Sequence, residues 1–192
     1  MSKLILTDID DTCLEFATPF QDYAEAQGIP TFGRLRDLYS LEAFMRLERA
    51  AAIEHLKGFA LNHGHEYPAE VCAKSILPQL HADGYKFVAI TACGLDPVFR
   101  LRRVRNLEDQ FGFRFDDVHV VDLGASKAAI LAEYPPSIWV EDHFGHAVVG
   151  AELGHRAFLL DRAYNRVDSH PLVTRVKDWH EIAEILGSEL DR

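Results

Sequence analysis

The feature that most constrains the fold is a series of short, almost continuously apolar runs separated by segments of helical character. A strand that is covered on both faces shows such a run, whereas a strand with one solvated face alternates apolar and polar residues. Strands that alternate with helices form βαβ units and a parallel sheet. We therefore predict an α/β fold, a Rossmann-like parallel sheet with helices on both faces. The predicted strands are 3–8, 86–91, 118–122, 137–142 and 156–161, and the predicted helices are 96–110, 126–133, 145–153 and the final "DWHEIAEIL".

One long segment interrupts this alternation. Residues 14–84 contain no clear strand, and they are far longer than a usual crossover connection. Within them, "SLEAFMRLERAAAIEHLKGFALN" places apolar side chains on roughly one face of a predicted helix, and Pro78 is expected to start or kink a last helix that ends near Gly84. We therefore predict a Rossmann-like core of residues 1–13 and 85–192 and a helical cap of residues 14–84.

Charge and composition exclude several classes of partner. The formal net charge of −10 argues against a nucleic-acid polymer or an anionic membrane as partner. No apolar run reaches the length of a membrane span, and Asp8 interrupts the first apolar run too early for a signal peptide. Cys13, Cys72 and Cys93 form neither a disulfide framework nor a metal-binding pair. We expect a reduced, cytoplasmic protein whose oligomeric state the sequence leaves open.

Carboxylates, a hydroxyl group and an ammonium group follow the predicted strands at the edge where an open parallel sheet binds its ligands. Clustered carboxylates favour a hard divalent cation, and Mg²⁺ is the usual one when phosphate is also bound. A hydroxyl and an ammonium group suit phosphate oxygens. A bound Mg²⁺ would also offset the repulsion among the carboxylates. The residues concerned are Asp8 and Asp10 after the first strand, Thr91 at the end of the second, Lys127 after the third, and Glu141 and Asp142 at the end of the fourth.

The stretch "DIDDT", residues 8–12, resembles the DxDxT signature of the haloacid dehalogenase-like phosphatase superfamily. Thr91 resembles the second motif of that superfamily, Lys127 the third, and Glu141-Asp142 the fourth, in the same order along the chain. The resemblance spans nearly the whole chain, and the predicted cap lies where this superfamily places its first type of cap. It implies a Mg²⁺-dependent phosphomonoester hydrolase with a small-molecule substrate.

The resemblance also implies roles for the first motif. Asp8 is the expected nucleophile, which attacks phosphorus to give an aspartyl-phosphate. Asp10 is the expected general acid–base, which protonates the leaving oxygen and then deprotonates water. A second aspartate at this position favours a phosphatase over a dehalogenase, in which no leaving alkoxide needs a proton. Asp11 occupies the variable position of the motif and receives no catalytic role.

The remaining motifs are expected to hold phosphate and metal. Thr91, Ala92 and Lys127 are the predicted phosphate-binding residues, with backbone N–H groups of the turn after Thr91 assisting. A lysine in the first turn of a helix opposes the helix dipole, and a broken local rule often marks function. The predicted metal ligands are Asp8, Asp10, Asp142 and Glu141, the last of them binding directly or through water.

Several residues keep an ordinary structural alternative. Asp8 could be a turn residue, Thr91 a strand end, Lys127 a surface lysine, and Glu141-Asp142 a helix cap. His143 and His146 have a spacing that could bind metal, but we interpret them as ordinary polar residues beside a cleft. Cys13 and Cys93 could form a redox-sensitive pair or pack as small residues. The arginines after the second strand do not share one face and are predicted to be solvated: Arg100, Arg102, Arg103 and Arg105.

The substrate is the least constrained part of the prediction. The stretches "FLLDRAYNR" and "VKDWHEI" resemble the 5′(3′)-deoxyribonucleotidase branch, which implies nucleoside 5′-monophosphates. Small sugar or organic phosphates are the alternative. A phospho-receiver or a non-catalytic phosphate-binding protein, each from a different functional class, would also gather such residues. A receiver carries its phosphorylated aspartate after the third strand, where this chain has Asp122. A receiver lacks a long insert, however, and the DxDxT match also argues against one. Cap aromatics could stack on a base or form the core of the cap: Phe16, Phe20, Phe32, Tyr39 and Phe44.

Overall fold

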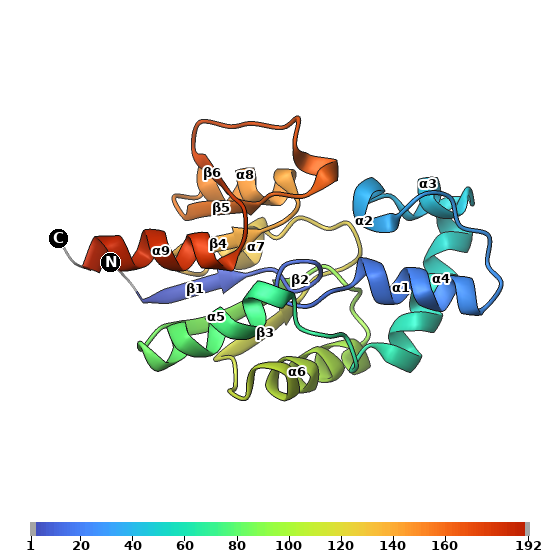
Figure 1. The fold of residues 1–192 in the computed structure, drawn as a ribbon, viewed down its shortest axis with the longest axis horizontal. Coiled ribbons are helices and arrows are strands. Elements are labelled where there is room, and N and C mark those ends of the chain that lie inside the picture. The colour runs from blue at the N-terminus through green and yellow to red at the C-terminus, as the bar shows by residue number, and fades with distance from the viewer. Residues whose placement is uncertain (1–2, 191–192) are drawn as a thin grey trace.

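The computed structural model describes residues 3–190 and contains a six-stranded, fully parallel sheet with the strand order β3-β2-β1-β4-β5-β6 (Figure 1). All of the predicted strands form, and the predicted α/β, Rossmann-like fold is confirmed. The sequence analysis missed β6, because "VTRV" has no continuous apolar run. The strands are β1 (Leu4–Thr7), β2 (Lys86–Thr91), β3 (Asp117–Val120), β4 (Ile138–Glu141), β5 (Arg156–Leu160) and β6 (Val173–Val176).

Helices cover both faces of this sheet, because successive strand residues point to opposite faces and both sets are apolar. Ile5 and Phe87 belong to a core shared with α5, α6 and α9, whereas Leu6 and Trp139 belong to a second core with α7 and α8. None of the helices in the described part of the chain is long and apolar enough to cross a membrane. The helices are α5 (Val71–Ala82), α6 (Pro97–Phe111), α7 (Ala128–Leu131), α8 (Phe144–Glu152) and α9 (Trp179–Leu190).

Four further helices form a group beyond the carboxyl end of β1, which we call the helical insert: α1 (Ala17–Ala26), α2 (Leu35–Leu38), α3 (Leu41–Met45) and α4 (Arg49–His63) (Figure 1). The single helix predicted for "SLEAFMRLERAAAIEHLKGFALN" is wrong, because it is two helices. Ser40 caps α3 by accepting a hydrogen bond from the Ala43 N–H at 3.2 Å. Arg46 ends α3 with a φ of 52°, and its guanidinium lies over the Phe32 ring at 3.8 Å.

The helix α5 connects the helical insert to β2. It begins at Val71 and contains Pro78 in its interior, so Pro78 does not start it, and Gly84 follows it with a φ of 88°. Buried residues of α5 and α9 belong to the same core as β1 and β2. The division into a core and a cap stays a prediction, and the packing of α5 favours a cap that ends before Val71.

Helix α8 approaches β4 closely enough to generate a stability prediction. A Cβ on Gly150 would stand 2.2 Å from Cδ1 of the fully buried Trp139. Gly150→Ala should therefore lower the free energy of unfolding by roughly 1–3 kcal/mol through overpacking, measured by urea denaturation. The control is Gly187→Ala on α9, where no atom lies within 4 Å of the added Cβ. It should stabilise the helix by about 0.5–1 kcal/mol, and equal effects of the two substitutions would contradict the packing.

Candidate active site

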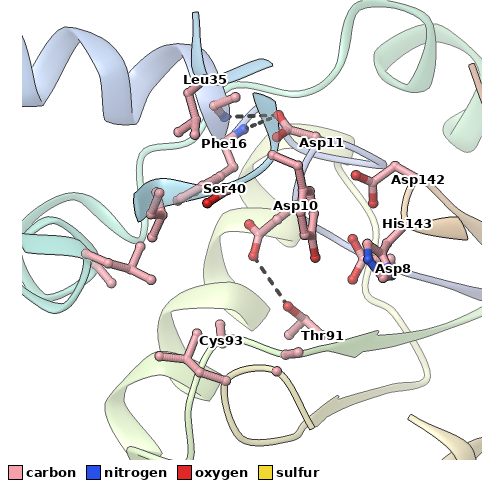
Figure 2. Close-up of a pocket in the computed structure, with 18 of the residues that line it drawn as sticks. Asp8, Asp10, Asp11, Phe16, Leu35, Ser40, Thr91, Cys93, Asp142 and His143 are labelled. Carbon is pink, nitrogen blue, oxygen red and sulfur yellow. Dashed lines mark hydrogen bonds between the residues drawn. The ribbon is translucent and has the colours of Figure 1, made fainter. Parts of the chain in front are cut away.

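The sheet order places the carboxyl ends of β2, β1 and β4 side by side. A cavity of about 620 Å³ lies there, between the strand ends and the helical insert (Figure 2). Cavities of this size commonly hold small ligands. The structure brings all the residues predicted for the site into its lining: Asp8, Asp10, Thr91, Ala92, Lys127, Glu141 and Asp142.

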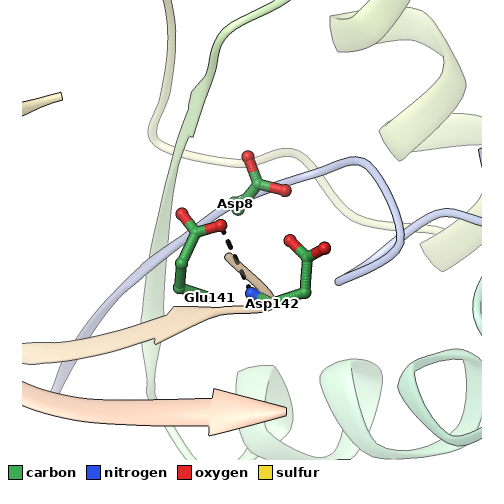
Figure 3. Close-up of side chains that lie close together, drawn as sticks. All are labelled: Asp8, Glu141 and Asp142. Carbon is green, nitrogen blue, oxygen red and sulfur yellow. Dashed lines mark hydrogen bonds between the residues drawn. The ribbon is translucent and has the colours of Figure 1, made fainter. Parts of the chain in front are cut away.

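Three carboxylates form a tight cluster on one side of this cavity. Asp8, Glu141 and Asp142 each offer an oxygen, and these oxygens lie within 4.8 Å of one another (Figure 3). All three residues are at most 5% exposed. Buried carboxylates at this separation repel one another strongly unless cations or hydrogen-bond donors offset their charge.

Lys127 supplies part of that compensation. Its side chain is only 2% exposed, and its ammonium group donates to Asp8 Oδ1 at 2.5 Å and to Glu141 Oε2 at 2.7 Å. Burial alone would lower the pKa of Lys127, but the carboxylates of Asp8 and Glu141 outweigh that effect and raise the pKa. Lys127 is therefore a charged, buried lysine immediately before α7, not a surface lysine.

Neutral donors hold the carboxylates of Glu141, the last residue of β4, and of Asp142, which follows it. The Asp142 carboxylate accepts hydrogen bonds from the Thr12 hydroxyl at 3.1 Å and from the Tyr164 hydroxyl. Glu141 Oε1 accepts from the backbone N–H groups of Asp142 at 3.3 Å and His143 at 3.1 Å. Burial raises the pKa of Glu141, with Lys127 opposing the rise, and burial followed by the charge of Asp8 raises the pKa of Asp142.

The cluster therefore has more negative charge than Lys127 offsets. Its donors are oxygen atoms, which are the ligands that hard divalent cations prefer. The geometry and the excess charge thus fit a divalent metal ion held by Asp8, Glu141 and Asp142. The Asp10 side chain is not part of this cluster of potential ligands.

Asp10 makes a different set of contacts on another side of the cavity (Figure 2). The Thr91 hydroxyl donates to Asp10 Oδ2 at 3.4 Å, and Arg103 Nη2 donates to the same oxygen at 3.1 Å. Burial raises the pKa of Asp10 to about 6, and the positive charge of Arg103 opposes this rise. The prediction that the arginines of α6 are solvated is wrong for Arg103, whose side chain is 5% exposed.

Asp11 has a structural task at the entry to the helical insert. Its φ of 57° turns the chain, and its Oδ1 accepts from the backbone N–H groups of Phe16 at 2.9 Å and Ala17 at 3.0 Å (Figure 2). These contacts satisfy free N–H groups at the start of α1. The structure therefore gives Asp11 the capping of α1, and it shows why the chain places a third carboxylate here.

The helical insert contributes fewer aromatic side chains to the cavity than the sequence suggested. Phe20 and Phe44 are fully buried in the hydrophobic core and are not among the residues that line the cavity, which favours the core alternative for both. Phe16 and Tyr39 do line the cavity. Tyr39 is 51% exposed, and its ring stacks on His143 at a centroid distance of 4.7 Å.

Among the described residues, His143 and His146 are outside the cluster of potential metal ligands, and Cys13 and Cys93 form no disulfide. Burial lowers the pKa of His143 and, with Lys127 adding to the effect, lowers that of His146 to about 4. Cys13 is buried beside the Thr7 hydroxyl at 3.3 Å, and Cys93 lines the cavity. Both thiols are free.

Comparison with known proteins places this geometry in a fold family. No family model and no curated protein matches the sequence. Several solved structures match nearly the whole chain. CbbY from Rhodobacter sphaeroides in complex with xylulose-1,5-bisphosphate has 18% identity and a TM-score of 0.62, covering 94% of this chain and 96% of that one. A hydrolase of the HAD superfamily from Ehrlichia chaffeensis has 12% identity and a TM-score of 0.57, covering 99% of each chain.

A third structure, the D,D-heptose 1,7-bisphosphate phosphatase from B. bronchiseptica with magnesium and phosphate, has 15% identity and a TM-score of 0.59, covering 98% of this chain and 99% of that one. The chain has the fold of haloacid dehalogenase-like phosphatases. The resemblance inferred from the four motifs is thus confirmed at the level of the fold. At these identities the likeness establishes the fold alone.

The sequence analysis missed two residues that contact the candidate site. Arg103 is four residues after Phe99 and four before Leu107, both of which are buried, so a charge on the apolar face of α6 was the available signal. Tyr164 is in a short 3₁₀ helix, Ala163–Asn165, and had no such signal. Its hydroxyl contacts Asp142 because the segment after β5 folds back over the end of β4.

The buried ion pairs of Lys127 with Asp8 and Glu141 should contribute to the free energy of unfolding. Lys127→Met should lower the free energy of unfolding by roughly 3–5 kcal/mol in chelator, because Asp8 and Glu141 lose their cation. The loss should be larger at pH 8 than at pH 5, since protonation of the carboxylates at lower pH relieves their repulsion. The control is Lys57→Met, an exposed lysine paired with Glu54, which should change stability by about 0–1 kcal/mol. A small, pH-independent effect of Lys127→Met would contradict the pairing.

Proposed function

We propose that this chain is a Mg²⁺-dependent phosphomonoester hydrolase that acts through an aspartyl-phosphate formed on Asp8. The observation that supports this most is the arrangement of acids around one cavity. Asp8 contacts Lys127 within the carboxylate cluster, whereas Asp10, two residues later, faces away from the cluster toward Thr91. The residues proposed as nucleophile and as acid–base group therefore line the same cavity and make separate contacts.

In the proposed reaction, an oxygen of Asp8 attacks phosphorus and forms a P–O bond as the bond to the leaving oxygen breaks. Asp10 gives its proton to the leaving oxygen and becomes a carboxylate. It then takes a proton from water, and the water oxygen attacks the phosphorus of the aspartyl-phosphate. Inorganic phosphate leaves, and Asp8 returns as a carboxylate. Lys127 binds Oδ1 of Asp8, which fixes the orientation of the carboxylate.

The carboxylate cluster is the proposed metal site. Asp8, Glu141 and Asp142 would hold the ion, which, when bound, supplies positive charge that offsets the carboxylates and stabilises the transferring phosphoryl group. The heptose bisphosphate phosphatase with the same fold is described with magnesium and phosphate. Asp10 as a metal ligand stays a prediction that the contacts of its side chain with Arg103 do not favour.

The proposed phosphate-binding residues stand at the end of β2. Thr91 is 1% exposed, lines the cavity together with Ala92, and has its hydroxyl beside Asp10. Backbone N–H groups near such a strand end are common phosphate donors. Lys127, which follows β3, also lines the cavity and adds positive charge for the phosphoryl oxygens.

The phospho-receiver alternative has weaker structural support. Its expected phosphorylation site, Asp122, follows β3, which is an edge strand, and Asp122 is not among the residues that line the cavity. The Asp122 carboxylate accepts a hydrogen bond from the backbone N–H of Leu123 at 2.8 Å, as in an ordinary turn. A turnover assay separates an enzyme from this alternative and from a non-catalytic phosphate-binding protein.

The substrate class remains a choice between nucleoside monophosphates and small sugar or organic phosphates. The neighbours with this fold include one protein in complex with xylulose-1,5-bisphosphate and one named as a heptose 1,7-bisphosphate phosphatase. We keep the proposal of nucleoside 5′-monophosphates, and Tyr39 is now the side chain that supports it, because it is half-exposed and lines the cavity. Stacking of a base on one aromatic side chain is worth about 1–3 kcal/mol.

The first functional prediction concerns the nucleophile. Asp8→Asn keeps the shape of the side chain but removes the attacking charge, so turnover of a generic aryl phosphate should fall by about three orders of magnitude or more. The matched control is Asp122→Asn, which should keep the parent activity. The assignment would be refuted if Asp8→Asn kept the turnover of the parent protein. It would also be refuted if Asp122→Asn lost turnover and Asp8→Asn did not.

The second concerns the metal. Mg²⁺ should raise the melting temperature of the parent protein, because an ion that binds only the folded state stabilises it by mass action. Asp142→Asn should abolish this rise, whereas Glu152→Gln, an exposed acid on α8, should preserve it. Activity should disappear in chelator and return with Mg²⁺. Full activity in chelator would disprove the metal requirement.

The third concerns substrate choice. In a panel of phosphomonoesters, nucleoside monophosphates should show a higher kcat/KM than small sugar phosphates, and Tyr39→Ala should narrow the gap by about 5–100-fold. Phe32→Ala serves as the control, since Phe32 is an exposed aromatic of the helical insert outside the cavity lining. A panel in which nucleotides rank no higher than sugar phosphates would reject the nucleotide proposal and leave the phosphatase proposal standing.

A further inference from the structure

One face of α6 forms hydrogen bonds with the end of α4 and with the segment between α4 and α5, which we call the return segment. Arg102 Nη1 donates to the carbonyl of Ala60 at 2.9 Å, near the end of α4. The Asn106 side chain accepts from the backbone N–H of Tyr67 at 3.0 Å and donates to its carbonyl at 2.8 Å. Asn106 is fully buried, so both of these hydrogen bonds are shielded from water. Helix α6 thus fixes the position of the Tyr67 backbone.

Arg103 lies between this return segment and Asp10. Its guanidinium stands over the Tyr67 ring at 4.2 Å from the centroid, which is a cation–π contact. On the other side, Nη2 lies 2.8 Å from Asp10 Oδ1 and donates to Oδ2 at 3.1 Å. A planar guanidinium stacked on a fixed ring has little rotational freedom, so the Asp10 carboxylate beside it is held in one orientation.

The two oxygens of Asp10 differ in their hydrogen bonds. Oδ2 accepts from both Arg103 and Thr91. Oδ1 is buried and lies 2.8 Å from Arg103 Nη2 in an ion pair, but it has no partner with hydrogen-bond geometry among the described residues. Arg103 therefore contacts both oxygens of a carboxylate that lines the cavity, and Oδ1 keeps unused hydrogen-bonding capacity.

We propose that Arg103 is a positioning residue, which holds the Asp10 carboxylate in the orientation for proton exchange with the leaving oxygen, and that Tyr67 fixes Arg103 in turn. This inference rests on the proposed role of Asp10 as the acid–base. Without Arg103, the Asp10 side chain would keep only the long contact with Thr91 at 3.4 Å. A displaced acid–base group transfers protons poorly even when it remains ionisable.

The test compares two classes of substrate. An alkyl phosphate has a basic leaving oxygen that needs a proton. The leaving group of p-nitrophenyl phosphate, p-nitrophenolate, is weakly basic and departs without one. Arg103→Met should lower kcat for the alkyl phosphate by about 100-fold and that for p-nitrophenyl phosphate far less. Asp10→Asn should show the same selectivity. Arg105→Met, an exposed arginine of α6 paired with Asp109, should leave both rates at the parent level.

A double-mutant cycle distinguishes positioning from general damage. On the alkyl phosphate, Asp10→Asn combined with Arg103→Met should be no slower than Asp10→Asn alone, because Arg103 acts through Asp10. Equal losses on both substrates with Arg103→Met, or losses that multiply in the double variant, would overturn the proposal for Arg103. If Asp10→Asn itself fails to discriminate between the substrates, the acid–base assignment of Asp10 is wrong, which is a separate failure.

Arg103→Lys keeps the test decisive if Arg103→Met does not fold. Lysine preserves the buried positive charge but offers no planar surface to stack on the Tyr67 ring and hold the charge in one place. We expect Arg103→Lys to fold with a melting temperature near that of the parent and still to lose activity on the alkyl phosphate selectively. Parent-like rates on both substrates in Arg103→Lys would overturn the proposal, because charge alone would then suffice.

Discussion

The buried ammonium group of Lys127 is the interaction on which the site depends. The sheet order places β1 directly beside β4, so Asp8 and Glu141 must end neighbouring strands in the interior of the molecule. Without a cation, such a pair would have to protonate or move apart. Lys127 contacts both carboxylates within hydrogen-bond distance and leaves the charge of Asp142 uncompensated by any lysine or arginine ion pair in the described residues. This excess of carboxylate charge is the observation that supports the proposed metal site.

The helical insert completes the site from the opposite side of the cavity. Its aromatic residues Phe20 and Phe44 are fully buried and belong to the same continuous hydrophobic core as β1 and β2, so the helical insert packs as an extension of that core. Tyr39, by contrast, lies outside that core, and its ring stacks on His143, the residue that follows Asp142 in the sequence. The return segment is bound to α6 through Asn106 and Arg103. A displacement of the helical insert would therefore shift the Asp10 carboxylate, because Tyr67 contacts Arg103 and Arg103 contacts Asp10.

Much of this arrangement could be predicted from the sequence, because it depends on local patterns. The strands before Asp8 and Glu141 are continuous apolar runs, and the convergence of parallel strand ends follows from topology. β6 could not be predicted, since "VTRV" is partly polar and forms by pairing with β5. The break at Arg46 depends on a left-handed backbone residue, which helix propensity does not reveal. Arg103 contacts Asp10 across 93 positions of sequence, so only the fold shows that contact.

The measurement that tests the account most directly is chemical trapping of the intermediate on Asp8. The protein is mixed with substrate and Mg²⁺, quenched within the first turnover, and treated with borohydride, which reduces an aspartyl-phosphate to homoserine. Peptide mass spectrometry then locates the modified residue. The account predicts homoserine at position 8, only when substrate is present, and at no other aspartate. Turnover without modification of Asp8, or with modification at Asp122, would contradict it.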